Sequence, residues 1–176
     1  MTATFYYDLG SPYAWLAAER IDALMAAEWV PVLLGGIFKA SGRSSWARTG
    51  RRAAGIAEIE RRARRRGLPA PVWPDPWPND GLHAMRVAVT GGKPFALAAF
   101  RLHFAEGRPL SDPANVEEAA RRAGVEPVPD GDGLRANTGA ALAQGVHGVP
   151  AVAVAGTVYW GDDRLEEAAA AAARLS

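Results

Sequence analysis

The alternation of hydrophobic and polar positions predicts a strand, a tight turn and a helix at the start of the chain. Residues 4–7 are β-branched or aromatic, as expected of a buried strand. Ser11 stands immediately before Pro12, so we expect Ser11 to cap the helix and Pro12 to take its first position. A capping hydroxyl there lies at the positive end of the helix dipole, which suits an anion. The apolar residues of the predicted helix, residues 14–27, recur at helical spacing at Trp15, Leu16, Ile21, Leu24 and Met25.

A second apolar run, residues 29–34, predicts a strand that Gly35 and Gly36 close. Pro31 indicates an early or edge position within the sheet, because proline cannot donate a ladder hydrogen bond. Strand, helix and strand in this order form a βαβ unit, and such a unit predicts a parallel pair of strands.

The middle of the chain is predicted to be mostly helical. It holds a proline-rich segment, residues 69–78, which cannot be a helix and is expected to be extended and ordered. A second interruption falls at residues 91–94, where two glycines and a proline occur close together. The helices expected from apolar spacing and capping residues cover residues 51–66, 82–89, 95–104, 112–123 and 133–144.

The strand pattern returns after Gly145. Residues 151–155 and 158–160 predict an antiparallel hairpin with its turn at residues 156–157. A last helix is expected over residues 164–175, with acidic residues near its start. The order is therefore β-α-β, a helical block, and β-β-α, which predicts an α/β fold class.

Composition excludes several kinds of catalytic and binding site. The 176 residues carry a net charge of +1 and contain no cysteine. Disulfide scaffolds, thiol nucleophiles and cysteine-ligated metals are thereby excluded, and the small net charge argues against nucleic acid as a partner. Neither a signal peptide nor a membrane-spanning run is visible, so no membrane partner is expected and a cytoplasmic location is the default.

Charged and titratable clusters give weaker signals. Arginines crowd residues 61–66, which suits either phosphate and nucleic-acid binding or a solvated helix face, and we favour the solvated face. The histidines His83, His103 and His147 show no metal-ligand spacing, so no metal site is expected. His103 is expected to be a packed or surface histidine rather than a catalyst.

Three motifs together resemble the 2-hydroxychromene-2-carboxylate isomerases, relatives of the kappa-class glutathione transferases in the DsbA-like branch of the thioredoxin fold. They are Phe5 to Trp15, Gly145 to Pro150, and Trp160 to Leu165. The resemblance implies a thioredoxin-like βαβ…ββα core over residues 1–35 and 130–176, with an inserted α-helical domain over residues 36–129. It also implies a cis Val149–Pro150 bond, although base rates alone favour trans.

The resemblance implies a glutathione site. Ser11-Pro12-Tyr13-Ala14 occupies the place of the Cys-x-x-Cys pair of redox-active DsbA relatives, so a dithiol oxidase is excluded. Ser11 would donate its hydroxyl to the glutathione sulfur and favour the thiolate, as the catalytic residue. Val149, beside Pro150, would pair with the glutathione backbone, and Asp162 and Asp163 would bind its γ-glutamyl end. Asp163 is the firmer assignment, because Arg164 and Leu165 follow it in the motif.

The second substrate is less well defined. The resemblance implies that the helical block binds it, and the candidate substrate residues are Tyr13, Lys39, Trp77, Asn79 and Arg86. Lys39, expected in a loop after the second strand, is a candidate partner for the substrate carboxylate, although we favour a surface lysine without that role. Ala54 and Gly55 stand where the related proteins carry a tyrosine.

The function implied is a glutathione-dependent isomerase acting on 2-hydroxychromene-2-carboxylate or a similar aromatic acid. A kappa-like glutathione transferase would use the same residues. A thioredoxin-fold glutathione-binding protein without catalysis is a further alternative, since the helical block is short and altered. Members of the resembled family tend to dimerise, so a homodimer is expected.

Overall fold

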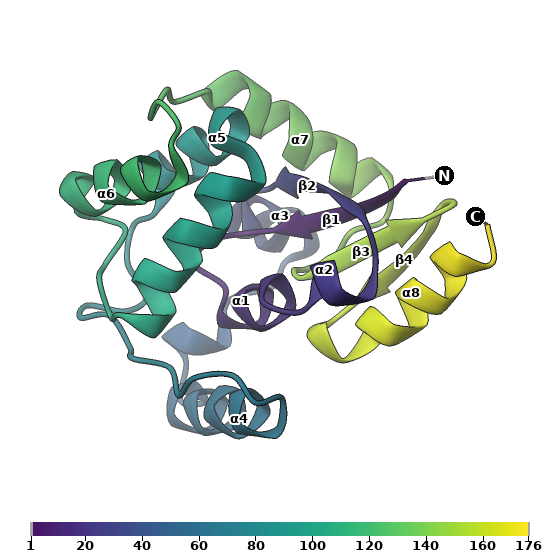
Figure 1. Cartoon of the computed structure of the whole chain (residues 1–176). Helices are drawn as coiled ribbons and strands as arrows, with labels where there is room; N and C mark the ends of the chain where they lie inside the picture. Colours follow the sequence, from purple (N-terminus) through teal and green to yellow (C-terminus); the bar gives the residue numbers. More distant parts are fainter. Residues whose placement is uncertain (1, 176) are drawn as a thin grey trace.

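A four-stranded sheet forms the centre of the computed structural model, which describes residues 2–175 (Figure 1). Its strands are β1 (Ala3–Tyr7), β2 (Ala27–Pro31), β3 (Ala151–Val154) and β4 (Thr157–Trp160), in the order β2-β1-β3-β4. β1 pairs parallel with β2 and antiparallel with β3, which pairs antiparallel with β4. The predicted βαβ unit and hairpin are therefore confirmed as halves of one mixed sheet.

Helices from both ends of the chain and from its middle cover the sheet. α8 packs against β3 and β4, while α5 and α7 contact β2. α5 also packs along α6, and α4 contacts α1 and lies below it in Figure 1. The α-helices are α1 (Pro12–Ala18), α2 (Ile21–Leu24), α3 (Leu34–Ser41), α4 (Arg52–Arg65), α5 (Leu82–Phe100), α6 (Pro113–Ala123), α7 (Gly131–Ala143) and α8 (Leu165–Ala173). Short 3-10 turns cover Trp46–Arg48 and Asp162–Arg164, and a π-helical turn covers Arg101–Ala105.

The predicted helix over residues 14–27 is wrong in its length. α1 ends at Ala18, α2 adds a single turn, and Ala27 already pairs with Ala3 of β1. Arg20 lies between the two helices with non-helical backbone angles, φ −122° and ψ −28°, and its side chain donates to the Asp162 carbonyl and pairs with Glu166 near the far end of the chain. Sheet register and this long-range contact therefore override the helical spacing of the apolar residues.

The second strand also ends earlier than expected. β2 stops at Pro31, and the Leu34 N–H then donates to Asp8 Oδ2 at 2.8 Å instead of continuing the ladder. Gly35 and Gly36 consequently lie inside α3 rather than closing the strand, and Lys39 lies on that helix rather than in a loop. The edge position expected from Pro31 is confirmed, because β2 is an outer strand.

Most other predicted elements are confirmed, with shifted ends. Asp112 caps α6 through the Ala114 N–H, and Gly92 interrupts α5 with φ 59° and ψ −157°. The β3–β4 turn centres on Ala155 and Gly156, with φ 48° and 83°, one residue before the predicted position. The proline-rich segment is not helical, as expected, but it bends at residues 75–78, where the bonds before Pro76 and Pro78 are cis.

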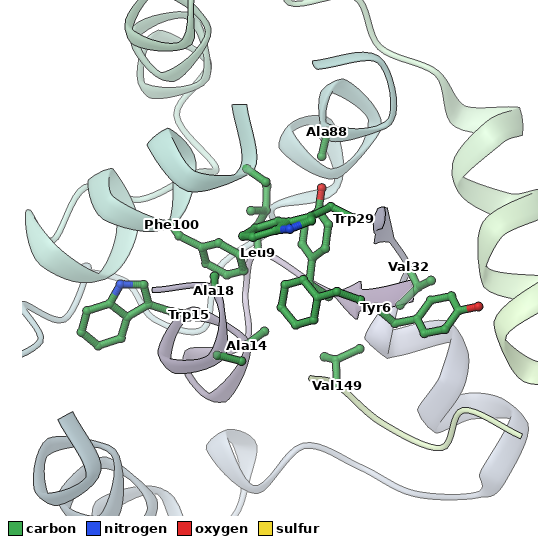
Figure 2. Close-up of a cluster of buried hydrophobic side chains, with 14 of the residues drawn as sticks. Tyr6, Leu9, Ala14, Trp15, Ala18, Trp29, Val32, Ala88, Phe100 and Val149 are labelled. Carbon is green, nitrogen blue, oxygen red and sulfur yellow. The ribbon is translucent and has the colours of Figure 1, made fainter. Parts of the chain in front are cut away.

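One hydrophobic core joins the sheet to the helical block. Aromatic rings from β1 and β2 pack edge to face, with Phe5 and Trp29 centroids 4.8 Å apart. Tyr7 extends this cluster to Phe100 of α5, and Trp15 of α1 extends the buried surface on the other side (Figure 2). The strand that leads into Ser11 is therefore fixed from both faces. Among residues 2–175, no helix is long and apolar enough to cross a membrane.

Candidate functional site

The turn between β1 and α1 holds Ser11 in a fixed position. The Ser11 N–H donates to the Asp8 carbonyl at 3.0 Å, and Asp8 Oδ1 accepts from the Gly10 N–H at 2.8 Å. The Ser11 Oγ accepts from the Ala14 N–H at 3.2 Å, which confirms the predicted N-cap. Because Oγ accepts this bond, its own proton remains available to a further acceptor. Burial raises the pKa of Asp8, although the backbone donors Leu34 and Gly10 oppose that rise.

A cis proline lies across the site from Ser11. The Val149–Pro150 bond is cis, as the resemblance implied, and the Pro150 carbonyl accepts from the Gly161 N–H at 2.9 Å. Neither the N–H nor the C=O of Val149 is hydrogen-bonded to any residue that the structure describes. Gly148 lies under the Trp160 indole, where a Cβ would come within 2.6 Å of the ring nitrogen.

A cavity of about 320 Å³ brings most of the predicted site together; we call it the Ser11 cavity. It is large enough for a small-molecule ligand. The predicted residues that line it are Ser11, Tyr13, Trp77, Val149, Pro150, Asp162 and Asp163. Ser11 is only 5% exposed, so a ligand atom bonded to it would be shielded from bulk water.

Three candidate substrate residues lie outside this cavity. Lys39 on α3 and Arg86 on α5 are exposed, and neither lines it. Arg86 faces the start of α7, close to Gly131. Asn79 lines a neighbouring cavity that shares Gly10 and Pro78 with the first.

The two acidic residues before α8 have different surroundings. Asp162 is fully buried, and its carboxylate pairs with Arg62, at 2.6 Å, and with Arg66. The Asp163 side chain is 61% exposed and approaches Arg62 only to 4.0 Å. Asp162 therefore has its carboxylate committed within the protein, whereas Asp163 can pair with a ligand cation.

The arginine-rich stretch is not simply a solvated face, so that interpretation is wrong for two of its members. Arg62 and Arg66 have side chains only 25% and 17% exposed, because they turn from α4 toward Asp162. Burial, reinforced by the nearby charges of Arg20 and Arg62, lowers the pKa of Arg66. The pairs attach α4 to the C-terminal half of the fold, a contact that sequence spacing could not reveal.

Several cavity residues were missed by the sequence analysis. Trp46 packs against Tyr13 and Trp77, with ring centroids 6.3 and 5.6 Å away. Its ring also lies on Gly55, where a Cβ would come within 2.2 Å of a ring atom. An indole from another segment therefore covers the backbone at Gly55. The other missed residues lining the cavity include Phe38, Arg43, Arg62 and Trp160.

Arg43 adds a second cation to the Ser11 cavity. Its guanidinium lies 5.0 Å from the Trp160 ring centroid and 5.5 Å from that of Phe38. Its Nη1 donates to the His147 carbonyl at 3.0 Å, and it pairs with no carboxylate among the described residues. The cavity therefore offers one uncommitted acid, Asp163, and a cation with no acidic partner, Arg43. No group of three metal-ligating side chains occurs in the part of the chain that the structure describes.

A comparison with models of protein families identifies the fold that produces this geometry. Residues 2–173 match the model of the DsbA-like thioredoxin domain. The chain belongs to this family. The DsbA-like fold explains why Ser11 faces a cis proline although the two are far apart in sequence.

Solved structures support the same fold. A 2-hydroxychromene-2-carboxylate isomerase is 21% identical and superposes with a TM-score of 0.81, over 99% of this chain and 96% of that one. A probable DsbA oxidoreductase from Streptomyces coelicolor is 17% identical, with a TM-score of 0.73, over 99% of this chain and 89% of that one. A search of curated proteins gave no match. At these identities the likeness shows the fold, and this DsbA-like chain lacks the cysteines that thiol–disulfide exchange requires.

Proposed function

We propose that this DsbA-like protein is a glutathione-dependent isomerase acting on 2-hydroxychromene-2-carboxylate or a similar aromatic acid. The observation that carries the proposal is the convergence of three groups on one cavity. These are the Ser11 hydroxyl, the unpaired backbone of Val149 beside a cis proline, and the exposed Asp163 carboxylate. Glutathione, a peptide with a thiol and a free ammonium, has a complementary group for each.

The residues present fit a peptide ligand. An extended peptide needs a backbone N–H and C=O to pair with, and Val149 has both free among the described residues. Asp163 can accept from the ammonium of the γ-glutamyl end, whereas Asp162 cannot, because Arg62 and Arg66 already occupy its carboxylate. We therefore propose that Asp163 binds glutathione and that Asp162 has a structural role.

Ser11 supplies the activating contact. Its O–H can donate to a sulfur, and such a bond stabilises a thiolate more than a thiol, which lowers the thiol pKa. When bound, glutathione supplies a thiolate that adds to a double bond of the substrate and is later eliminated. While the thiolate is attached, that bond is single and can rotate. The protein holds the sulfur at Ser11, orients the peptide along Val149 and limits the access of water.

Aromatic side chains in the Ser11 cavity support the proposal that the substrate is an aromatic acid. Tyr13, Trp46 and Trp77 pack in sequence along one wall of the Ser11 cavity. Arg52 reinforces that wall by donating to the Trp77 carbonyl at 3.0 Å. A planar aromatic acid can pack against such rings while the sulfur lies at Ser11.

Product analysis tests the proposal. The protein is incubated with glutathione and 2-hydroxychromene-2-carboxylate, and the products are separated by chromatography. We expect the isomerised open-chain acid, with the glutathione concentration unchanged. A stable glutathione conjugate would instead indicate a kappa-like transferase, which needs the same site. Failure to bind glutathione at millimolar concentration would overturn both assignments.

A further inference from the structure

A second cavity lies beside the Ser11 cavity, and the proposed reaction has so far given it no role. Its volume is about 370 Å³, and it shares Gly10 and Pro78 with the first. We call it the Asn79 cavity, after the candidate substrate residue that lines it together with Arg48 and His103. Gly10 directly precedes Ser11, so a ligand in this cavity would lie next to whatever Ser11 binds.

His103 presents an unused acceptor to the Asn79 cavity. The side chain is 1% exposed, and its Nδ1–H donates to the Arg108 carbonyl at 3.1 Å. Burial lowers the pKa of His103 to about 4, so the ring is neutral near pH 7 and Nε2 carries a lone pair. Nε2 has no hydrogen-bond partner in the part of the chain that the structure describes. A ligand hydroxyl that donates to Nε2 would satisfy it.

Arg48 presents an unused cation. It forms no ion pair with any described carboxylate, unlike Arg62 and Arg66 on the neighbouring helix. Asn79 donates through Nδ2 to the Pro76 carbonyl at 2.9 Å, which holds its side chain at the cavity wall. This cavity therefore combines a cation, an amide and a neutral imidazole.

The carboxylates of the cavity are already in use. Both Asp8 oxygens accept backbone N–H groups, from Gly10 and Leu34, and Asp80 Oδ1 accepts from Leu82. A ligand anion would therefore be drawn to Arg48 and kept away from Asp8 and Asp80. Leu82, Met85 and Leu110 complete the lining with apolar surface.

We propose that the second substrate, a hydroxylated aromatic carboxylic acid, reaches from the aromatic wall of the Ser11 cavity into the Asn79 cavity, where its carboxylate binds Arg48 and its hydroxyl donates to His103. This inference rests on the proposed function for the identity of the reaction, but its binding site is separate from Ser11. It replaces Lys39 as the carboxylate partner, since the fold leaves both Lys39 and the other cationic candidate, Arg86, outside both cavities.

Binding of a stable probe to the whole chain without glutathione tests the inference. The probe is o-hydroxycinnamate, which carries both groups, and isothermal titration calorimetry gives its Kd. We expect Arg48→Gln to weaken binding by about tenfold or more, as loss of a charged hydrogen bond would. The control is Arg51→Gln, an exposed arginine outside both cavities, which should bind the probe as the unmodified chain does.

The hydroxyl contact is tested by changing ligand and residue together. The unmodified protein should bind o-hydroxycinnamate about tenfold more tightly than cinnamate, which lacks the hydroxyl. His103→Phe should remove that difference. Equal loss of affinity in Arg48→Gln and Arg51→Gln, no preference for the hydroxylated acid, or no binding at millimolar probe would each overturn the inference.

Glutathione affinity, measured separately, distinguishes this inference from the proposed function. If the acid binds through Arg48 while glutathione does not bind, the cavity assignment stands and the isomerase proposal fails. If glutathione binds and Arg48→Gln does not weaken binding of the acid, only the cavity assignment fails.

Discussion

Ser11 shows how one side chain can serve both the fold and the proposed chemistry. Its Oγ accepts from the Ala14 N–H, which caps α1, and its proton faces a cavity lined by Val149 and Asp163. A hydroxyl can do both because it accepts through a lone pair and donates through its hydrogen. The two roles predict different consequences when the hydroxyl is removed.

Ser11→Ala is expected to reduce kcat/KM for the glutathione-dependent reaction by roughly 100-fold, because the hydroxyl that donates to the charged sulfur is lost. The free energy of unfolding should fall by only about 1 kcal/mol, the usual effect of losing a cap. Steady-state kinetics and urea unfolding measure the two. Asp112→Ala, which removes the matching cap of α6, should reproduce the stability loss with normal turnover. Normal turnover in Ser11→Ala would contradict the role given to Ser11.

At the scale of elements, α4 is attached to the rest of the molecule by buried charge. Arg62 and Arg66 reach from α4 to Asp162, and Arg20, which lies between α1 and α2, donates to the Asp162 carbonyl. Arg62 also lies 5.2 Å from the Tyr13 ring centroid, so the same pairs place a wall of the Ser11 cavity. The position of α4 and the shape of the cavity therefore depend on each other.

Asp162→Asn is expected to lower the free energy of unfolding by about 3 kcal/mol, because it removes the counter-charge of the mostly buried Arg66 and leaves Arg62 paired mainly with Glu58. Asp163→Asn should leave stability unchanged and weaken glutathione binding, since its carboxylate is mostly exposed. Denaturant unfolding and calorimetry separate the two effects. Asp132→Asn, which breaks a fully exposed pair with Arg135, is the control and should change neither quantity. The assignment fails if the two neighbours behave alike.

At the scale of the whole molecule, one core ties the sheet to the helical block. Buried residues run without interruption from β1 through α5 to the π-helical turn that carries His103. The His103 ring packs edge to face on Phe104, with centroids 4.6 Å apart. Its protonation would place a charge in that core, so it affects global stability.

Stability is expected to fall by about 3 kcal/mol as the pH drops from near 6.5 to near 4. Burial lowers the pKa of His103 to about 4 in the folded chain, whereas an unfolded histidine titrates near 6.5. Over this range the unfolded state therefore binds a proton that the folded state excludes. The raised pKa of Asp8 acts in the opposite direction at the acid end.

Urea unfolding of the unmodified chain and of His103→Gln at several pH values isolates the histidine, because the other groups cancel in the difference. A histidine NMR titration gives the His103 pKa directly and also serves if the variant folds poorly. A His103 pKa near 6.5 in the folded protein would contradict the expectation.

Local chemistry accounts for what the sequence alone determined. The strand before Ser11, its cap, the break at Gly92 and the terminal hairpin follow from short-range steric and hydrogen-bonding preferences. The resemblance to a known family supplied the cis bond before Pro150. Together these predicted the fold class and seven of the residues that line the Ser11 cavity.

Tertiary structure decided what depends on partners distant in sequence. The pairing of Ala27 with Ala3 limits the predicted first helix, and Asp8 binds the Leu34 N–H where β2 was expected to continue. Arg62 and Arg66 make Asp162 a buried ion-pair partner, whereas the carboxylate of its neighbour Asp163 stays exposed. The Asn79 cavity likewise joins Arg48 to His103, which lie on separate elements. No periodicity encodes such pairs, because charge burial and cavity lining depend on how the elements pack against one another.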